Sequence, residues 1–297
     1  MLNLNLIEKF KYINNPLCDS WSNLGDKEKD IIIQGRIERD AMSYADINRI
    51  IQQWKDSNID EYNDHYLNMM KLIVEKLSFA GNVDILEIGP GTGELVGLLG
   101  DLFSPNATYT AMDIAQPFLD FIKEEKKHQL SKFKSVNFIS GNFKDYSFEK
   151  KYDLIIICGS LHHMPFRMEI YKKLYELCNE NAYVVLVDGR NRNFCPLTIS
   201  RNIRKVLSPD FDILDHCHFL TEKEMKRIPH ITDFALHNLY FSVPKPKKLF
   251  HYLYNFLYKN KYDNKYKFEL NICKKMPAKY FATQMFVVLK KNSGDGS

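Results

Sequence analysis

Short apolar runs alternate with amphipathic stretches between about residues 83 and 190. Each run is too short for a helix and is apolar at consecutive positions, which is typical of strands buried on both faces. Between the runs, apolar residues such as Leu95, Leu98 and Leu102 recur at helical spacing. This alternation predicts an α/β fold in which helices cover both faces of a mostly parallel sheet. The predicted strands are DILEIG (84–89), TYTAMD (108–113), VNFISGN (136–142), YDLIIICG (152–159) and AYVVLVD (182–188).

The flanking regions have different patterns. Residues 1–80 lack strand alternation and predict an N-terminal helical cap, with its clearest helix at about 64–79. Near the other end, Thr221 and Glu224 have the spacing of a capping box and predict a short helix. Two last strands are predicted in FALHNLYFSV and YFATQMFVVLKK. We therefore expect a cap over 1–80 and an α/β domain over 81–297.

Composition agrees with an ordinary folded protein, since 45% of the 297 residues are hydrophobic and 26% are charged. No apolar run approaches the ~18 residues of a membrane span, and the first residues show no secretory signal. The cysteines lie far apart without a CxxC pair, which favours reduced thiols over a disulfide framework or a zinc site. We expect a cytoplasmic protein. The cysteines are Cys18, Cys158, Cys178, Cys195, Cys217 and Cys273.

Charge is unevenly distributed along the chain. The net charge is +4, yet residues 245–291 carry twelve Lys against two acids, which gives 12 − 2 = +10. Most of this charge lies in a basic, aromatic insertion at about 245–279. A lid or a homodimer contact is the first interpretation of this insertion, and a membrane surface the second. An acidic carrier protein or an anionic acceptor are further alternatives, whereas nucleic acid is disfavoured because Lys without Arg lacks bidentate recognition.

The turn after the first predicted strand is rich in glycine. It does not match a P-loop, because no Lys followed by Ser or Thr completes a GxxxxGK pattern. It also fails the dinucleotide fingerprint GxGxxG, because Glu94 stands where the third glycine would fall. A carboxylate at the helix start would repel phosphate as well. The turn therefore favours a ligand without phosphates, unless it is only a tight strand-to-helix connection. Its residues are Gly89, Pro90, Gly91, Thr92 and Gly93.

Asp113 ends the second predicted strand, twenty residues after Gly93. An acid at this place in an open parallel sheet can accept hydrogen bonds from both hydroxyls of a ribose. Together with the glycine turn, it indicates an adenosine without a pyrophosphate. The alternative is that Asp113 caps a helix and binds no ligand.

In combination, these residues resemble the class I S-adenosylmethionine-dependent methyltransferases, particularly small-molecule enzymes of the ubiquinone and menaquinone type. The first motif of that family, E/DxGxGxG, is matched from Glu87 to Gly93. The resemblance implies S-adenosylmethionine as the cofactor and a Rossmann-like seven-stranded sheet of order 3-2-1-4-5-7-6, with the seventh strand antiparallel. By the same resemblance, Asn142 and Phe143 lie where the family reads the adenine amino group and ring edge, and Asn142 is a departure because Asp is commoner there. The implied cofactor-binding residues are Glu87, Gly89, Pro90, Gly91, Thr92, Gly93, Asp113, Ile114, Asn142, Phe143, Cys158, Gly159 and Ser160.

A histidine pair follows the fourth predicted strand, in GSLHHM. Methyl transfer needs a base only when the acceptor must lose a proton, and imidazole titrates close to neutral pH. The resemblance suggests His163 facing the acceptor, with His162 packed or hydrogen-bonded; the alternative is that both only shape the loop. Asp188 and Arg190, at the end of the fifth predicted strand, are candidates for contact with an acceptor, although structural ion pairs are the preferred interpretation of Arg190 and Arg192. His216, Cys217 and His218 are too close in sequence to form a metal site without further ligands, so no metal is expected.

The expected activity is methyl transfer to the oxygen or nitrogen, rather than carbon, of a small organic acceptor, in quinone-like or secondary metabolism. A protein or RNA methyltransferase that docks through its basic segment is one alternative. Such an enzyme acting on amides or bases usually carries an NPPY-like tetrapeptide where this chain has CGSL. A protein that binds S-adenosylmethionine without methylating is the other.

Overall fold

The structure is a computed structural model that describes residues 52, 60–103, 105–164, 167–189, 220–242, 265–272, 282 and 284–293. Most of the predicted cap, most of the 245–279 insertion, and Arg190 and Arg192 with the 216–218 cluster lie outside these residues. Cys158 and Cys178, the cysteines among the described residues, are free thiols. None of the described helices is long and apolar enough to cross a bilayer.

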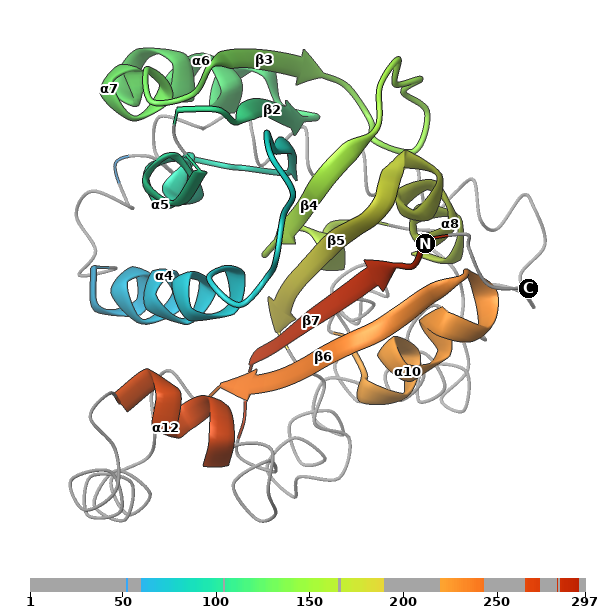
Figure 1. Ribbon diagram of the computed structural model, residues 1–297. Helices are drawn as coiled ribbons and strands as arrows, with labels where there is room; N and C mark the ends of the chain where they lie inside the picture. The colour runs from blue at the N-terminus through green and yellow to red at the C-terminus, as the bar shows by residue number, and fades with distance from the viewer. Residues whose placement is uncertain are drawn as a thin grey trace, which may run out of the picture.

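Seven strands form one sheet in the order β3-β2-β1-β4-β5-β7-β6, as the resemblance implied (Figure 1). The first five are parallel, and β7 is antiparallel to both of its neighbours. The two last strands are those that the alternation predicted. The bounds are β1 Asp84–Ile88, β2 Thr108–Asp113, β3 Ser135–Ser140, β4 Tyr152–Cys158, β5 Cys178–Gly189, β6 Phe234–Ser242 and β7 Gln284–Lys291.

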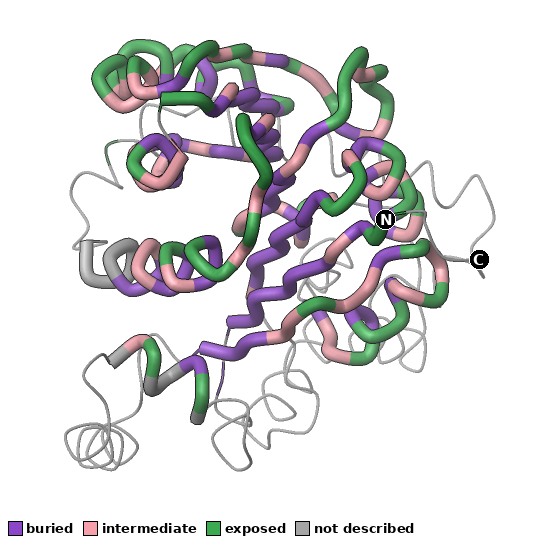
Figure 2. The backbone as a smooth tube through the Cα atoms, in the orientation of Figure 1, coloured by how far each residue is buried: buried purple, intermediate pink, exposed green. Residues whose placement is uncertain are grey.

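Helices cover both faces of the sheet (Figure 1). Alternate residues of each strand point to opposite faces, so that Ile85 of β1 joins one apolar cluster while Leu86 joins the other. The central strands are therefore buried along most of their length, whereas the edge strand β3 is partly exposed (Figure 2). The first cluster contains residues of α4 Asp60–Val74, α5 Glu94–Phe103, α6 Gln116–Glu125 and α12 Lys265–Ile272, and the second contains residues of α8 Arg167–Leu177 and α10 Glu222–Ile231.

Several element boundaries differ from the sequence prediction, and two of the differences have a clear local cause. The helix expected at about 64–79 is α4, which ends at Val74, because the amides of Lys76 and Leu77 bond three residues back and form turns. Strand β5 begins four residues before the predicted AYVVLVD run, since Cys178 already pairs with Tyr152 across an irregularity in the register. Asn181 lies at this irregularity with a φ of 64°, a conformation that Asn tolerates better than most residues.

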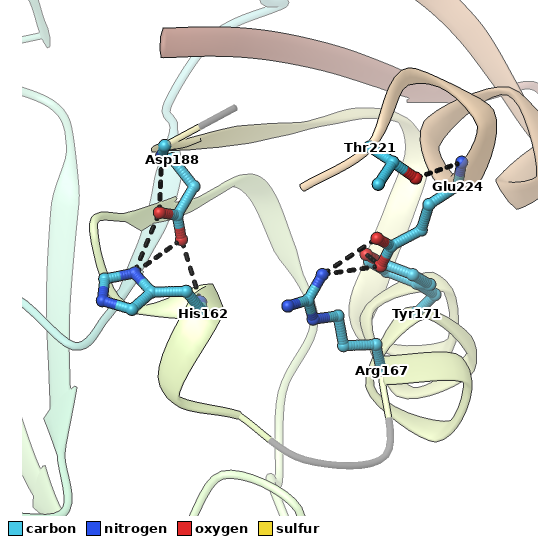
Figure 3. A network of polar contacts seen from close by, with 7 residues as sticks. His162, Arg167, Tyr171, Asp188, Thr221 and Glu224 are labelled. Atoms are coloured by element: carbon cyan, nitrogen blue, oxygen red, sulfur yellow. Dashed lines mark hydrogen bonds and ion pairs between the residues drawn. The ribbon is translucent and has the colours of Figure 1, made fainter. Parts of the chain in front are cut away.

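A buried ion pair joins α8 to α10. Nη1 of Arg167 donates to both carboxylate oxygens of Glu224, at 3.0 and 2.9 Å, and the Tyr171 hydroxyl donates to the same carboxylate at 2.7 Å (Figure 3). The side chains of Arg167 and Glu224 are 0% and 3% exposed. Thr221 caps α10 as predicted, by accepting from the Glu224 amide. The Glu224 side chain, however, does not complete a capping box. It binds Arg167 instead and thereby fixes α10 on α8.

Replacing Glu224 should destabilise the fold strongly. Glu224→Ala removes the carboxylate that faces a buried guanidinium, a loss that typically costs about 3–5 kcal/mol. Lys226→Ala, which removes the exposed partner of the Glu222–Lys226 bridge on the same helix, should cost only about 0.5 kcal/mol. Urea unfolding of both variants measures the difference, and equal losses would contradict the role given to the buried pair.

Candidate functional site

The predicted site residues meet at the carboxyl ends of β2, β1, β4 and β5. Because parallel neighbours end at the same edge of a sheet, Asp113, Glu87, Cys158 and Asp188 gather there although they are far apart in sequence. Hydrogen bonds join these strand ends: the Gly89 amide donates to Met112 O at 2.7 Å, Ser160 Oγ donates to Ile88 O at 3.0 Å, and the Gly159 amide donates to Val187 O at 2.8 Å.

The glycines at this edge fall into two groups. Gly89, Gly91, Gly93 and Gly159 all have positive φ, which side chains disfavour. A Cβ on Gly89 would lie 2.5 Å from Ser160 atoms, and one on Gly93 would lie 2.8 Å from Ile122, so these two allow close packing within the protein. A Cβ on Gly91 or Gly159 would meet nothing within 4 Å. Backbone is therefore left bare beside open space at the ends of β1 and β4.

Asp113 is held by backbone amides at the end of β2. Its carboxylate accepts from the Gly91 amide at 3.4 Å and from the Ala115 amide at 2.9 Å. The residue is 7% exposed. Burial raises the pKa of this carboxyl, and the bonds from Ala115 and Gly91 partly oppose that rise. The bonds fix the carboxylate beside the bare backbone of the glycine turn.

Glu87 and Glu94 add two acids to the same edge. Glu87 is fully buried and accepts a hydrogen bond from the Tyr109 hydroxyl at 2.6 Å. Burial raises its pKa from an ordinary 4.5 to about 7, and Glu94 and Asp113 add to the rise, while the Tyr109 bond opposes it. Burial also raises the pKa of Glu94, whose carboxylate accepts from the Thr92 hydroxyl at 3.0 Å. A cation bound here would relieve the repulsion among these acids.

Tyr66 is a site residue that the sequence pattern did not reveal. It lies on the buried stripe of α4, where its spacing marked only a core position. Burial raises the pKa of its hydroxyl well above the usual range, and Cys158 and then Glu87 raise it further. Burial likewise raises the pKa of the Cys158 thiol. The helix α4 therefore brings a neutral hydroxyl beneath the acids of the strand ends.

His162, in the short helix η2 Leu161–His163, forms a hydrogen-bonded pair with Asp188, which lies at the end of β5 (Figure 3). The Asp188 carboxylate lies 2.9 and 3.0 Å from His162 Nδ1 and accepts from the His162 amide at 2.9 Å. Asp188 is almost fully buried, whereas the His162 side chain is 24% exposed. The ring of the exposed His163 lies 3.9 Å from the His162 ring, centroid to centroid. Thus the carboxylate fixes one histidine, and that histidine contacts the other.

The loop after β3 carries the residues that the resemblance assigns to adenine. Asn142 is exposed; its amide nitrogen donates to Asp145 at 2.8 Å and its oxygen accepts from the Lys144 amide at 3.1 Å. The Phe143 side chain is buried in the core, so only its backbone can face a ligand. Ile114, next to Asp113, is 47% exposed.

Comparisons with known proteins agree with this arrangement. Residues 86–184 match the model of a family described as a methyltransferase domain. A malonyl-[acyl-carrier protein] O-methyltransferase of Priestia megaterium is 32% identical over 120 residues, which are 39% of this chain and 42% of the relative. A second enzyme of that name, from Ilyobacter polytropus, is 26% identical over 184 residues, or 58% of this chain and 66% of the relative. This chain thus spans less than two thirds of the length of either.

A solved structure resembles the whole described fold. The plantazolicin methyltransferase BpumL, in complex with S-adenosylhomocysteine and a monoazolic desmethyl analogue, has a TM-score of 0.56 and 19% identity over 90% of this chain and 98% of its own. At this identity the likeness concerns the fold alone.

Replacing Glu87 by Gln should make the stability of the ligand-free protein less dependent on pH. Since the folded pKa of about 7 lies above the ordinary 4.5, the carboxyl stabilises the folded state below pH 4.5, and this contribution is lost as the pH rises through 7. In Glu87→Gln this loss is absent. Between about pH 5 and about pH 8, the free energy of unfolding of the variant, measured in urea, should therefore rise relative to that of wild type by roughly 2 to 3 kcal/mol. Glu124→Gln, an exposed control, should show no such change, and a parallel response of all three proteins would contradict the raised pKa.

Proposed function

We propose that this chain, a member of the class I S-adenosylmethionine-dependent methyltransferases, transfers a methyl group from S-adenosylmethionine to an oxygen or nitrogen atom of a small organic acceptor. The family membership agrees with the resemblance stated from the sequence and rests on the matched domain and the sheet order. One observation carries the proposal: bare backbone at Gly91 and Gly159 lies beside the buried carboxylates of Asp113 and Glu87.

The charges of the strand ends fit this cofactor. When bound, S-adenosylmethionine supplies a methyl group already activated on a sulfonium, and the sulfonium and the amino group make it cationic. Glu87, Glu94 and Asp113 are acids whose pKa values burial raises, and a cationic ligand favours their ionised forms. We assign the ribose hydroxyls to Asp113, and the bare turn around Gly91 to the close approach of the ligand.

Alignment accounts for much of the expected rate. Holding the acceptor in line with the methyl group can lower the barrier by roughly 7–11 kcal/mol without any further catalytic group. The rigid strand ends, tied together by Ser160 and by the Gly89 amide, suit that task.

One feature supports an oxygen atom as the acceptor, and a second supports a carrier protein as the partner. The two relatives described above are named as malonyl-[acyl-carrier protein] O-methyltransferases. The 245–279 insertion is rich in lysine, which suits an acidic carrier protein. We therefore favour an oxygen acceptor on a small organic molecule, either free or attached to a carrier protein that docks on this insertion.

An acceptor hydroxyl would have to lose its proton, and we assign this step to His162. Asp188 holds Nδ1 of His162 at 2.9 Å, which leaves Nε2 on the opposite side of the ring, directed away from the carboxylate. A carboxylate that orients an imidazole and stabilises its protonated form is the arrangement used by many general bases. The sequence had suggested that His163 faces the acceptor; the contact with Asp188 favours His162, with His163 as the alternative.

Asp113→Ala should weaken cofactor binding. Loss of two hydrogen bonds from ribose hydroxyls to a charged acceptor should reduce the affinity for S-adenosylhomocysteine about 100-fold or more, which calorimetric titration measures. The control Asp120→Ala removes an exposed carboxylate from the neighbouring helix α6 and should leave the affinity unchanged. Equal affinities of both variants would refute the ribose assignment.

His162→Ala should retain cofactor affinity and lose turnover. With a hydroxyl acceptor, removal of a general base lowers kcat about 10²- to 10⁴-fold, measured with cofactor labelled on the methyl group. His163→Ala should be the milder change. The reverse order of the two variants would transfer the role to His163, and turnover unaffected in both would mean that the acceptor needs no base. Cofactor binding without transfer to any acceptor would indicate a non-methylating protein.

A further inference from the structure

A buried cation stands at the start of α8, shortly after the histidine pair. Arg167 is the first residue of α8, and the helix η2, which carries His162, ends at His163. The Arg167 side chain is 0% exposed. A guanidinium keeps its proton in proteins, and a buried charge is costly unless it is paired. The groups that surround Arg167 therefore determine what this cation contributes.

Two carboxylates from different elements share the Arg167 cation. Nη1 donates to both oxygens of Glu224, at 3.0 and 2.9 Å. Figure 3 shows the guanidinium between Glu224 and the pair formed by Asp188 and His162. Burial alone would lower the pKa of the guanidinium, but the surrounding negative charges, that of Glu224 first and that of Asp188 among the others, outweigh burial and raise it. The buried ion pair of the fold and the histidine pair of the site are thus electrostatically connected.

Backbone hydrogen bonds hold the end of β5 beside this ion pair. The Leu220 amide, which directly precedes the N-cap Thr221 of α10, donates to Gly189 O at 3.0 Å. The side chain of the preceding residue, Asp188, is only 2% exposed and accepts from the His162 amide. Burial disfavours the charged form of a carboxylate, whereas a nearby cation favours it. A permanent cation at this place is what an ionised carboxylate at the end of β5 requires.

The other titratable groups around His162 carry no permanent charge. The ring of His163 lies 3.9 Å from that of His162, centroid to centroid. At the end of β4, burial keeps the Cys158 thiol neutral by raising its pKa. The hydroxyl of Tyr171 on α8 donates to the Glu224 carboxylate. Among the described residues around the ring, the permanent charges are those of Asp188, Arg167 and Glu224.

We propose that Arg167 is a positioning residue of the site: from its place between Glu224 and Asp188, it keeps the Asp188 carboxylate ionised, and this carboxylate holds His162 by Nδ1. The inference rests on the proposed function, in which Nε2 of His162 takes the proton of an acceptor hydroxyl. The acceptor oxygen then bonds to the methyl carbon, while the bond from that carbon to sulfur breaks and leaves its electron pair on sulfur.

Glu224 moderates the effect of the cation. Without Glu224, the uncompensated charge of Arg167 would make His162 harder to protonate, and without Arg167 the two carboxylates would make it easier to protonate. The buried pair therefore sets the pH at which His162 becomes a base, in addition to fixing α10 on α8.

Histidine NMR of the ligand-free full chain tests this inference without any acceptor. With isotope-labelled histidine rings, and with the His162 signal assigned from the spectrum of His162→Gln, the midpoint of the His162 titration is read directly. Arg167→Met removes a positive charge and should raise the midpoint by roughly one pH unit, whereas Glu224→Gln removes a negative charge and should lower it by a similar amount. The double variant Arg167→Met with Glu224→Gln should return the midpoint close to that of wild type.

The variants separate electrostatics from packing. Lys172→Met is the matched control, since it removes a positive charge from an exposed position of α8 and should leave the midpoint unchanged. Glu224→Gln keeps an oxygen that accepts from the guanidinium, so it decides the question if Arg167→Met does not fold. Opposite shifts in the two single variants support the inference, because loosened packing would move both midpoints in the same direction. One midpoint shared by all variants, or shifts of the same sign, would overturn it.

Turnover with cofactor labelled on the methyl group distinguishes this inference from the proposed function. With a hydroxyl acceptor, the acid side of the pH profile of kcat should follow the NMR midpoint in each variant, while the affinity for S-adenosylhomocysteine stays unchanged. Constant midpoints together with intact methyl transfer would overturn the inference alone. Shifted midpoints in a protein that methylates no acceptor would overturn the proposed function, and with it the catalytic purpose of Arg167.

Discussion

The carboxyl ends of the central parallel strands concentrate negative charge, and the rest of the site depends on this constraint. Glu87, Asp113 and Asp188 come from three strands that lie within four consecutive places of the sheet, and each is less than a tenth exposed. Burying a carboxylate is costly unless it is hydrogen-bonded or paired. Hydrogen bonds within the protein offset part of that cost: Glu87 accepts one from the Tyr109 hydroxyl, and Asp113 accepts from backbone amides.

The three carboxylates are compensated to different degrees. Asp188 contacts His162. Its charge also adds to that of Glu224 in raising the pKa of the Arg167 guanidinium. Arg167 itself is paired with Glu224, so the acceptor side of the site is connected to the packing of α8 on α10. The pKa of Glu87, by contrast, is raised to about 7. The cofactor side is therefore where a positive ligand has the most to contribute.

The fold could be predicted well from the sequence because its signals are local and repeated. Five short strand-like runs separated by helical periodicity indicate a covered parallel sheet, and all five are strands. The glycine turn and Asp113 could be located for the same reason, since each directly follows a strand. The end of α4 was predicted too far along the chain, because Leu77 continues the apolar spacing after the helical hydrogen bonds have stopped.

Contacts between distant residues were not predictable in this way. Tyr66 fits the apolar stripe of its helix, and nothing in the spacing reveals that Cys158 and Glu87 lie near enough to raise the pKa of its buried hydroxyl. The sequence around Lys173 predicts only an ordinary helix lysine, whereas in the structure its Nζ donates to the loop carbonyls of Lys144 and Tyr146. The partner of Glu224 could not be inferred either, since its spacing from Thr221 indicated only a helix cap. These residues act through tertiary packing, on which a single sequence carries no information.

The central claim is that a cationic adenosyl cofactor completes the charge of these strand ends. Calorimetric titration of wild type with S-adenosylmethionine near pH 6, in buffers of different ionisation enthalpy, tests it most directly. Binding should release protons, because the cation lowers the pKa of Glu87 from about 7, and the release should disappear in Glu87→Gln. Binding without proton release, or proton uptake, would contradict the account.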